Sequence, residues 1–140
     1  MTQKLSEREE IRKSDSPAVA VARAHVKAWG NHDWDVARKF LAEDVHLTVS
    51  TIQPIMAATD TTEADIYMEG LIKFAQTILP ESVNVTDSIG DEHNALLMVT
   101  VKTAIIPGKP PVTLPGARLY QIDEKGKIKA EKVIFCILEN

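Results

Sequence analysis

The sequence predicts an α+β fold in which a cone-shaped, curved antiparallel sheet wraps around three helices. Three observations predict it. Apolar residues repeat at helical spacing in the first half of the chain, they alternate in the second half, and the helical segments come before most of the strands. Helices in such an order gather on one face of the sheet.

The first two helices are predicted to form a hairpin. Ser16 followed by Pro17 is typical of a helix start. Gly30 and the residue after it are expected to supply a left-handed cap, so this helix should run to Trp29. Asp33 is placed to cap a second, short helix. Its predicted inward residues are Val36, Ala37, Phe40 and Leu41.

The period switches to two after Asp44, which predicts a first strand with Val45, Leu47 and Val49 on one face. A third helix is expected to start at a capping pair of Thr62 and Asp65 and to end at Pro80. The apolar face of this helix contains Ala64, Met68, Leu71, Ala75 and Ile78.

The rest of the chain is predicted to consist of strands over 83–89, 95–105, 117–122 and 127–138. The proline-rich segment 107–116 is expected to be a long hairpin loop, because proline donates no ladder hydrogen bond.

Composition limits the function classes. The chain has 140 residues, so we expect one domain over 16–140 after a flexible, polar segment 1–15. The net charge of −4 and the scattered basic residues argue against nucleic acid. No apolar run is long enough for a membrane span, and a single cysteine fits a reducing, cytoplasmic compartment.

Metal and cofactor motifs are not found in the sequence. The four histidines show no close ligand spacing, and there is no CxxC, HExxH, nucleophile elbow or phosphate-binding glycine loop. We therefore expect no metal and no cofactor.

His25 is the most informative residue, because it interrupts an apolar helical stripe made by Ala18, Val21, Ala22, Ala28 and Trp29. Its imidazole is expected to point into the interior. Burying it without a hydrogen bond costs about 1–3 kcal/mol, so it needs a partner or a cavity.

Three strings carry a family resemblance: AWGNHDWD at 28–35, FLAEDV at 40–45 and GKI at 126–128. They resemble the nuclear transport factor 2-like superfamily, whose cystatin-like fold is shared by ketosteroid isomerases and SnoaL-like polyketide cyclases. The resemblance covers about residues 17–138. It implies a pocket inside the cone, between the first helix, the third helix and the concave sheet face. The same register implies these inward residues on the later strands: Leu97, Val99, Val101, Thr103 and Ile105, then Arg118 and Tyr120, then Glu131, Val133 and Phe135.

At the positions that two of the superfamily's activities require, this sequence carries different residues. The isomerase tyrosine, base aspartate and second aspartate correspond to His25, Val49 and Arg118 in this sequence. Steroid isomerisation by the usual aspartate base is therefore not expected. The epoxide hydrolases carry an Arg-x-Asp pair on the middle strand, and 99–103 contains none.

The resemblance leaves His25, Arg118 and Glu131 as candidate catalytic residues. Arg118 keeps its proton, so it requires a carboxylate from Glu131 or from a bound acid. A paired Glu131 stays ionised, whereas an isolated one would be a general acid. His25, with an ordinary pKa of about 6.5, is suited to proton exchange near neutrality. The candidate ligand-binding residues are Trp29, Val49, Tyr67, Leu71, Val99, Val101, Tyr120 and Phe135.

Each candidate also has a structural interpretation. His25 could be a core residue bonded to a backbone carbonyl or to Tyr120, and Arg118 with Glu131 could form an ion pair at the rim of the cone. Tyr67 could lie on the outer side of its helix.

The leading hypothesis is a cofactor-independent SnoaL-like enzyme that uses general acid–base proton transfer on a hydrophobic carbonyl or polyketide-like compound. The alternative is a non-catalytic ligand-binding or dimerisation module of the same fold. The predicted outer sheet face is unusually apolar, which favours a homodimer through it. Its residues are Leu96, Met98, Leu119, Ile134 and Cys136.

Overall fold

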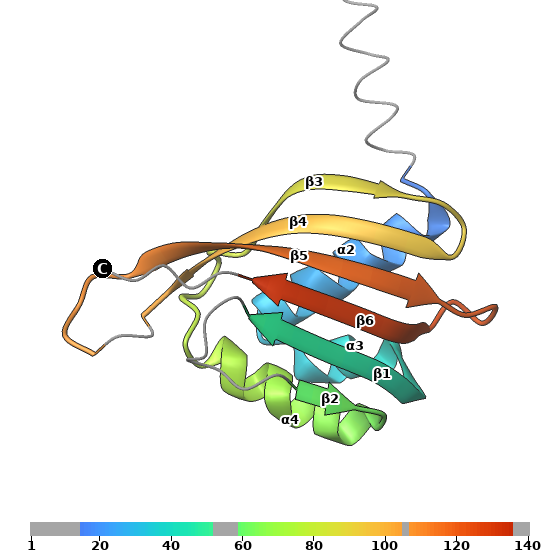
Figure 1. Cartoon of the computed structure of the whole chain (residues 1–140), viewed down its shortest axis with the longest axis horizontal. Coiled ribbons are helices and arrows are strands. Elements are labelled where there is room, and N and C mark those ends of the chain that lie inside the picture. The colour runs from blue at the N-terminus through green and yellow to red at the C-terminus, as the bar shows by residue number, and fades with distance from the viewer. Residues whose placement is uncertain (1–14, 52–58, 105–106, 136–140) are drawn as a thin grey trace, which may run out of the picture.

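A computed structural model describes residues 15–51, 59–104 and 107–135, which form three helices and six strands (Figure 1). The helices are α2 (Pro17–Gly30), α3 (Trp34–Lys39) and α4 (Ala64–Ala75). The strands are β1 (Leu41–Thr51), β2 (Thr59–Thr61), β3 (Asn84–Gly90), β4 (Asn94–Thr103), β5 (Val112–Ile122) and β6 (Ile128–Phe135).

The six strands form one curved sheet in the order β2-β1-β6-β5-β4-β3, with the helices behind it (Figure 1). The predicted α+β class is confirmed. The sheet is mostly antiparallel, but β1 and β6 are parallel, which the sequence analysis did not predict. Both strands start at the same end of the sheet, where the amide of Ile128 donates to the carbonyl of Phe40 over 2.7 Å.

The core lies between the helices and the inner sheet face. The expected stripe of α2 is buried, including Ala18, Ala22, His25 and Trp29, whereas Val21 is half-buried. On β4 the alternation is as predicted: Ala95, Leu97, Val99, Val101 and Thr103 are buried. The periods of 3.6 and 2 therefore locate the inner surface of both layers.

The start of α2 is confirmed, but its predicted left-handed cap is wrong. Ser16 accepts a hydrogen bond from the amide of Val19. At the other end, Gly30 is the last helical residue, and the positive φ of 59° falls on His32 in the following turn. Gly30 serves close packing instead, because a Cβ there would lie 3.1 Å from the Cβ of Val83.

The second helix is shorter than predicted. Asp33 caps α3 through the amide of Val36, but the helix ends at Lys39, so Leu41 belongs to β1. Backbone pairing of Leu41 with the start of β6 competes with a further helical turn. Tertiary hydrogen bonding therefore decides this boundary.

The third helix also differs at both ends. Glu63 is the N-cap of α4 and makes no side-chain cap bond, so the predicted capping pair does not form. The helix stops at Ala75 rather than at Pro80. Ile78 instead pairs as a β-bridge with Thr103, whose hydroxyl donates to the carbonyl of Thr77 over 2.7 Å. Pairing with β4 therefore replaces the last predicted helical turn.

The predicted proline-rich loop is shorter than expected, because β5 already begins at Val112 and contains Pro115. Pro115 pairs with Thr100 of β4. Pairing of β5 with β6 starts only at Gly116, so Pro115 lies where β5 has no neighbour on its second side among the described residues. A proline is tolerated at such an edge.

Some predictions concern parts of the chain outside the described residues. These are the flexible segment up to residue 14, Ile105, Cys136 with the rest of the predicted last strand, and the side chain of Phe135. Within the described part, none of the three helices has the length and apolar run that a membrane-spanning helix requires.

The core packing gives a stability prediction. Leu97 is fully buried in β4, so Leu97→Ala should lower the free energy of unfolding by about 2–5 kcal/mol. Ile66 on α4 is 45% exposed, so Ile66→Ala should change it by less than about 0.5 kcal/mol. Urea unfolding followed by circular dichroism measures both, and equal losses in the two variants would contradict the assignment of the inner face.

Candidate functional site

A network of three ionisable side chains lies at the centre of the cone. The Nη1 atom of Arg118 on β5 is 2.7 Å from Oε2 of Glu131 on β6. The hydroxyl of Tyr67 on α4 donates a hydrogen bond to Oε1 of the same carboxylate. The side chains of Arg118 and Glu131 are only 9% and 0% exposed. The ion pair is therefore interior and does not lie at the rim.

The sequence periods explain how these groups meet. Arg118 faces Val133 across the β5–β6 ladder and Tyr120 faces Glu131, so all four side chains share the inner face. Tyr67 belongs to the apolar face of α4 that packs on this sheet, and it is buried. Its inward orientation rules out the outer-side alternative.

The charge state of the network follows from its contacts. Burial alone would lower the pKa of Arg118, but the Glu131 carboxylate together with Tyr120 and Tyr67 outweighs burial and raises it. Burial, reinforced by the same carboxylate, raises the pKa of the Tyr67 hydroxyl well above its usual 10. Arg118 and Glu131 therefore form a buried ionic pair, and Tyr67 donates to it as a neutral phenol.

His25 lies inside the same cluster but carries no charge at neutral pH. Its ring centre is 6.2, 5.9 and 6.2 Å from those of Phe40, Tyr67 and Tyr120. Burial, with a smaller contribution from Arg118, lowers the pKa of His25 to about 3. The expected proton exchange near neutrality therefore does not fit this environment, because the imidazole stays neutral there.

Several buried polar atoms near the pair lack partners. Both ring nitrogens of His25 and Nε1 of Trp29 make no hydrogen bond within the described part of the chain. The Tyr120 hydroxyl adjoins the ion pair, and its interaction with Arg118 helps to raise the pKa of the guanidinium. The expected bond from His25 to a carbonyl or to Tyr120 does not form there. Buried polar groups are normally paired, so this cluster is suited to a polar ligand group.

A narrow cleft of about 20 Å³ reaches Arg118, the only charged residue among the eight that line it. The others are Phe74, Val99, Val101, Leu114, Pro115, Gly116 and Val133. The guanidinium carbon lies 4.7 Å from the ring centre of Trp29 and 5.9 Å from that of Phe74. Aromatic faces thus stabilise the cation without neutralising it.

The predicted ligand-binding residues divide into two groups. Val99 and Val101 line the cleft. The remaining described ones do not line it: Trp29, Tyr67, Leu71 and Tyr120 are buried in the core, and Val49 is half-buried.

Sequence reasoning missed five cleft residues as ligand contacts: Phe74, Leu114, Pro115, Gly116 and Val133. Val133 was placed on the inner face, but Leu114 fell in the segment predicted to be a loop. Phe74 lies off the apolar face expected for α4, so only its aromatic character signalled a role.

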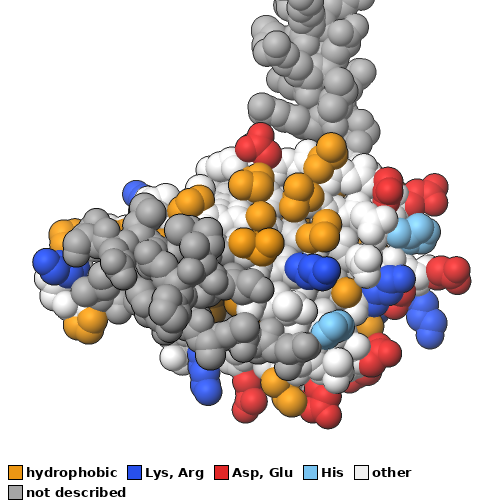
Figure 2. All heavy atoms as spheres, in the orientation of Figure 1, with side chains coloured by type: hydrophobic (Ala, Val, Ile, Leu, Met, Phe, Trp, Pro, Cys, Tyr) orange, Lys and Arg blue, Asp and Glu red, His pale blue; other side chains and the backbone are white. Residues whose placement is uncertain are grey.

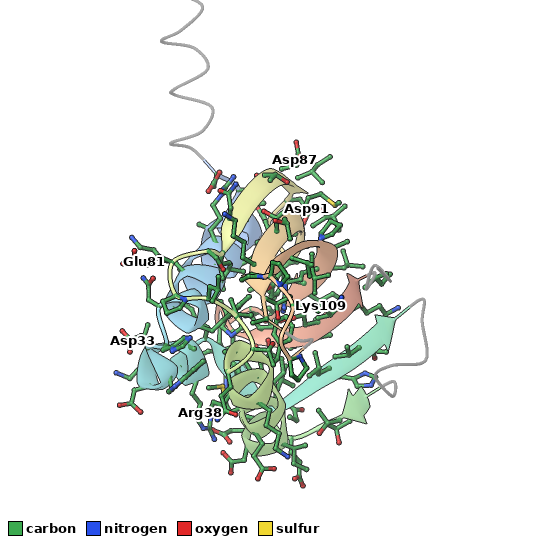
Figure 3. The ribbon with its side chains drawn as sticks, turned by 90° about the vertical axis from the view of Figure 1, so that its left-hand side faces the viewer. Asp33, Arg38, Glu81, Asp87, Asp91 and Lys109 are labelled. Carbon is green, nitrogen blue, oxygen red and sulfur yellow. The ribbon has the colours of Figure 1, made fainter. Side chains whose placement is uncertain are left out.

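The charged surface lies apart from this network. In the side view, Asp33, Arg38 and Glu81 project outwards from the molecule (Figure 3). Arg38 contacts Glu43 and Asp65 at 3.2 and 2.9 Å in an exposed cluster. Among the described residues, no group of three His, Cys, Asp or Glu side chains could hold a metal ion.

The family comparison matches residues 22–131 to the SnoaL-like domain. This chain belongs to the SnoaL-like domain family. The predicted resemblance is thereby confirmed. A comparison with curated proteins gave no match.

Solved structures show the same fold. A candidate SnoaL-like polyketide cyclase from Shewanella putrefaciens CN-32 has a TM-score of 0.72 at 13% identity, covering 93% of this chain and 86% of that one. A protein from Kribbella flavida DSM 17836 has a TM-score of 0.66 at 24% identity, and the match covers 83% of this chain and 84% of that one. An LEH-like epoxide hydrolase from M. tuberculosis has a TM-score of 0.63 at 17% identity, and the match covers 85% of this chain and 82% of that one. At these identities the likeness establishes the fold, and its neighbours include candidate and named enzymes.

The buried pair gives a second prediction. Arg118→Met leaves the Glu131 carboxylate buried without its counter-ion and should lower the free energy of unfolding by about 3–5 kcal/mol. The double variant Arg118→Met/Glu131→Gln should lose less than the sum of the two single variants. Arg38→Met, in the exposed ion-pair cluster, serves as the control and should have little effect. Additive losses in urea unfolding would contradict the pairing.

His25 gives a prediction for pH. Its pKa is about 3 in the folded chain and about 6.5 when unfolded, so between these values only the unfolded state binds the proton. Stability from this residue is therefore lost as pH falls below 6.5, by about 2 kcal/mol between pH 7 and pH 5. His25→Phe should remove that part of the pH dependence, whereas His46→Phe on the exposed face of β1 should keep it. Identical profiles for the natural chain and His25→Phe would contradict the low pKa.

Proposed function

We propose that this chain is a cofactor-independent SnoaL-like enzyme that moves protons on an apolar carbonyl or polyketide-like compound. One observation carries the proposal: among the described residues, a buried guanidinium fixed by a carboxylate is the only charged group that lines an otherwise apolar cleft. A fixed cation in a water-poor site stabilises a developing oxyanion more strongly than water does.

Arg118 takes the role of oxyanion stabiliser in this proposal. It donates to the carbonyl oxygen while the neighbouring carbon loses a proton, and the electron pair of that C–H bond moves into the enolate. Glu131 lies 2.7 Å behind the Arg118 guanidinium and outside the residues that line the cleft, so it accepts the proton and returns it to the substrate only once the cleft has widened around the ligand. Tyr67 holds the carboxylate through its hydrogen bond. His25 acts as a neutral hydrogen-bonding group beside the site.

A second candidate function is a non-catalytic binding module. The small cleft volume of about 20 Å³ favours it, because that space holds about one water molecule. A catalytic pocket for a larger compound requires the cleft to widen when the ligand enters. The two functions differ in whether proton transfer accompanies binding.

We further propose that the outer sheet face forms a homodimer. Figure 2 shows hydrophobic side chains gathered on this face. Met98, Leu119 and Ile134 are 38%, 40% and 53% exposed, and Leu96 beside them is half-buried. The sheet register makes them contiguous, because Leu96 faces Leu119.

A second copy fits this face by charge as well as by shape. Asp87 projects from β3 on one side of the apolar area (Figure 3), and Lys132 lies on β6 on the other. A two-fold axis running along the strands between β4 and β5 brings β3 of one copy opposite β6 of the other, with Asp87 two residues along the strand from Lys132. Closed two-fold symmetry then covers the same surface on both copies.

Catalysis is tested by deuterium exchange, because enolisation replaces hydrogen next to a carbonyl whatever the natural substrate is. The natural chain should accelerate α-exchange of small ketones and esters in D₂O, measured by proton NMR. Glu131→Gln should lose about 10²-fold or more of that rate while ketone binding remains. Glu124→Gln, at the exposed β5–β6 turn, should keep the full rate. Binding without any accelerated exchange would support the binding module instead.

Dimerisation is tested by light scattering after gel filtration at micromolar concentration. The natural chain should elute as a dimer, and Leu119→Glu should give a monomer, because it buries a charge in the apolar contact. Ile66→Glu, at an exposed position of α4, is the matched control and should remain dimeric. A monomeric mass for the natural chain in this measurement would contradict the proposed dimer.

A further inference from the structure

We infer that Glu131 is a specificity-determining residue that makes the site accept uncharged carbonyl ligands and exclude carboxylates. The inference rests on the same cleft as the proposed function and narrows its substrate class. The sequence analysis left open whether Arg118 would meet Glu131 or a bound acid. The structure pairs it with Glu131.

The charge of the site decides between the two ligand classes. Arg118 is the only charged residue among the described ones that line the cleft, and its Nη1 atom is already 2.7 Å from the Glu131 carboxylate. A carboxylate ligand on the same guanidinium would place two negative charges around one positive charge. In an interior that screens charges poorly, two such carboxylates repel each other strongly.

No second cation compensates for that repulsion among the described groups that face Arg118. These are His25 and Trp29 from α2, Tyr67 and Phe74 from α4, Tyr120 from β5 and Glu131 from β6. Of these, only His25 is basic, and its imidazole is neutral at pH 7. An acid entering the cleft therefore gives the buried site a net negative charge.

A neutral carbonyl compound avoids that cost and keeps the favourable contacts. Its oxygen accepts from the guanidinium, which the pairing with Glu131 leaves positively charged. Its apolar body contacts Phe74, Leu114 and Val133. The unpartnered Nε1 of Trp29 lies on the ring that stacks on Arg118, so a further donor is present beside the same cation.

The experiment compares acetamide with acetate, which have nearly the same shape and differ in charge. Leu114→Ala is used as the background to widen the cleft. Binding is followed by NMR at pH 7 through the indole N–H resonance of Trp29, assigned by its survival in Trp34→Phe. In this background acetamide should bind at least tenfold more tightly than acetate. Adding Glu131→Gln should reverse the order, because Arg118 then lacks its internal counter-ion.

Glu124→Gln in the same background is the matched control. It removes one negative charge from the exposed turn and should leave the acetamide-to-acetate ratio unchanged. Arg118→Met should weaken the binding of both compounds. If Glu131→Gln fails to fold, the inference is decided by the acetamide-to-acetate binding ratio of the Leu114→Ala variant that retains Glu131. If Leu114→Ala fails to fold, formamide and formate, which are smaller, are titrated into the natural chain.

Acetate binding as tightly as acetamide, an unchanged ratio in Glu131→Gln, or no binding of either compound would overturn the inference. These outcomes are separate from those for catalysis. A tenfold preference for acetamide without accelerated α-exchange would support the charge selection and contradict the proposed enzyme activity.

Discussion

The buried pair of Arg118 and Glu131 constrains the whole inner surface of the cone. A guanidinium does not lose its proton in a protein, so its burial requires a carboxylate at this place. Both residues lie on the inner face only in the observed register of β5 and β6. A shift of either strand by one residue would turn its charged side chain to the opposite face and leave the other charge alone in the core. The pair therefore specifies strand register and builds the candidate site with the same two side chains.

The groups around the pair show how the core combines packing with chemistry. Tyr67 donates a hydrogen bond to the Glu131 carboxylate, and the rings of Trp29 and Phe74 lie against the guanidinium. His25 and Trp29 nevertheless keep polar atoms without partners in the described part of the chain. Retaining several such atoms in one place lowers stability, and violations of this kind concentrate at functional sites. The neutral state of His25 shifts the proposed chemistry from the imidazole to Arg118 and Glu131.

The sequence allowed the fold and the composition of the inner face to be predicted, because periodicity reports which side of an element is buried. His25 was placed inside for this reason, and the family resemblance implied the inward positions of Arg118, Tyr120 and Glu131. The direct contact between Arg118 and Glu131 depends on strand register, and the low pKa of His25 depends on how completely its neighbours exclude water. The spacing of residues along the sequence determines neither this contact nor this pKa. Element ends were also misjudged where pairing partners distant in sequence decide them, as at Leu41, Ile78 and Pro115.

The position of β6 has a consequence for how this sheet is assembled. It is the last described strand in the chain, yet it lies between β1 and β5, in parallel with the first strand. Two halves of the sheet therefore stay separate until β6 has been synthesised, and each half exposes an unpaired edge in the meantime. Closure of the sheet joins residues that are far apart in sequence, so its entropy cost falls late in folding. Insertion of this strand also delivers the Glu131 carboxylate, so Arg118 acquires its counter-ion only when the sheet is complete.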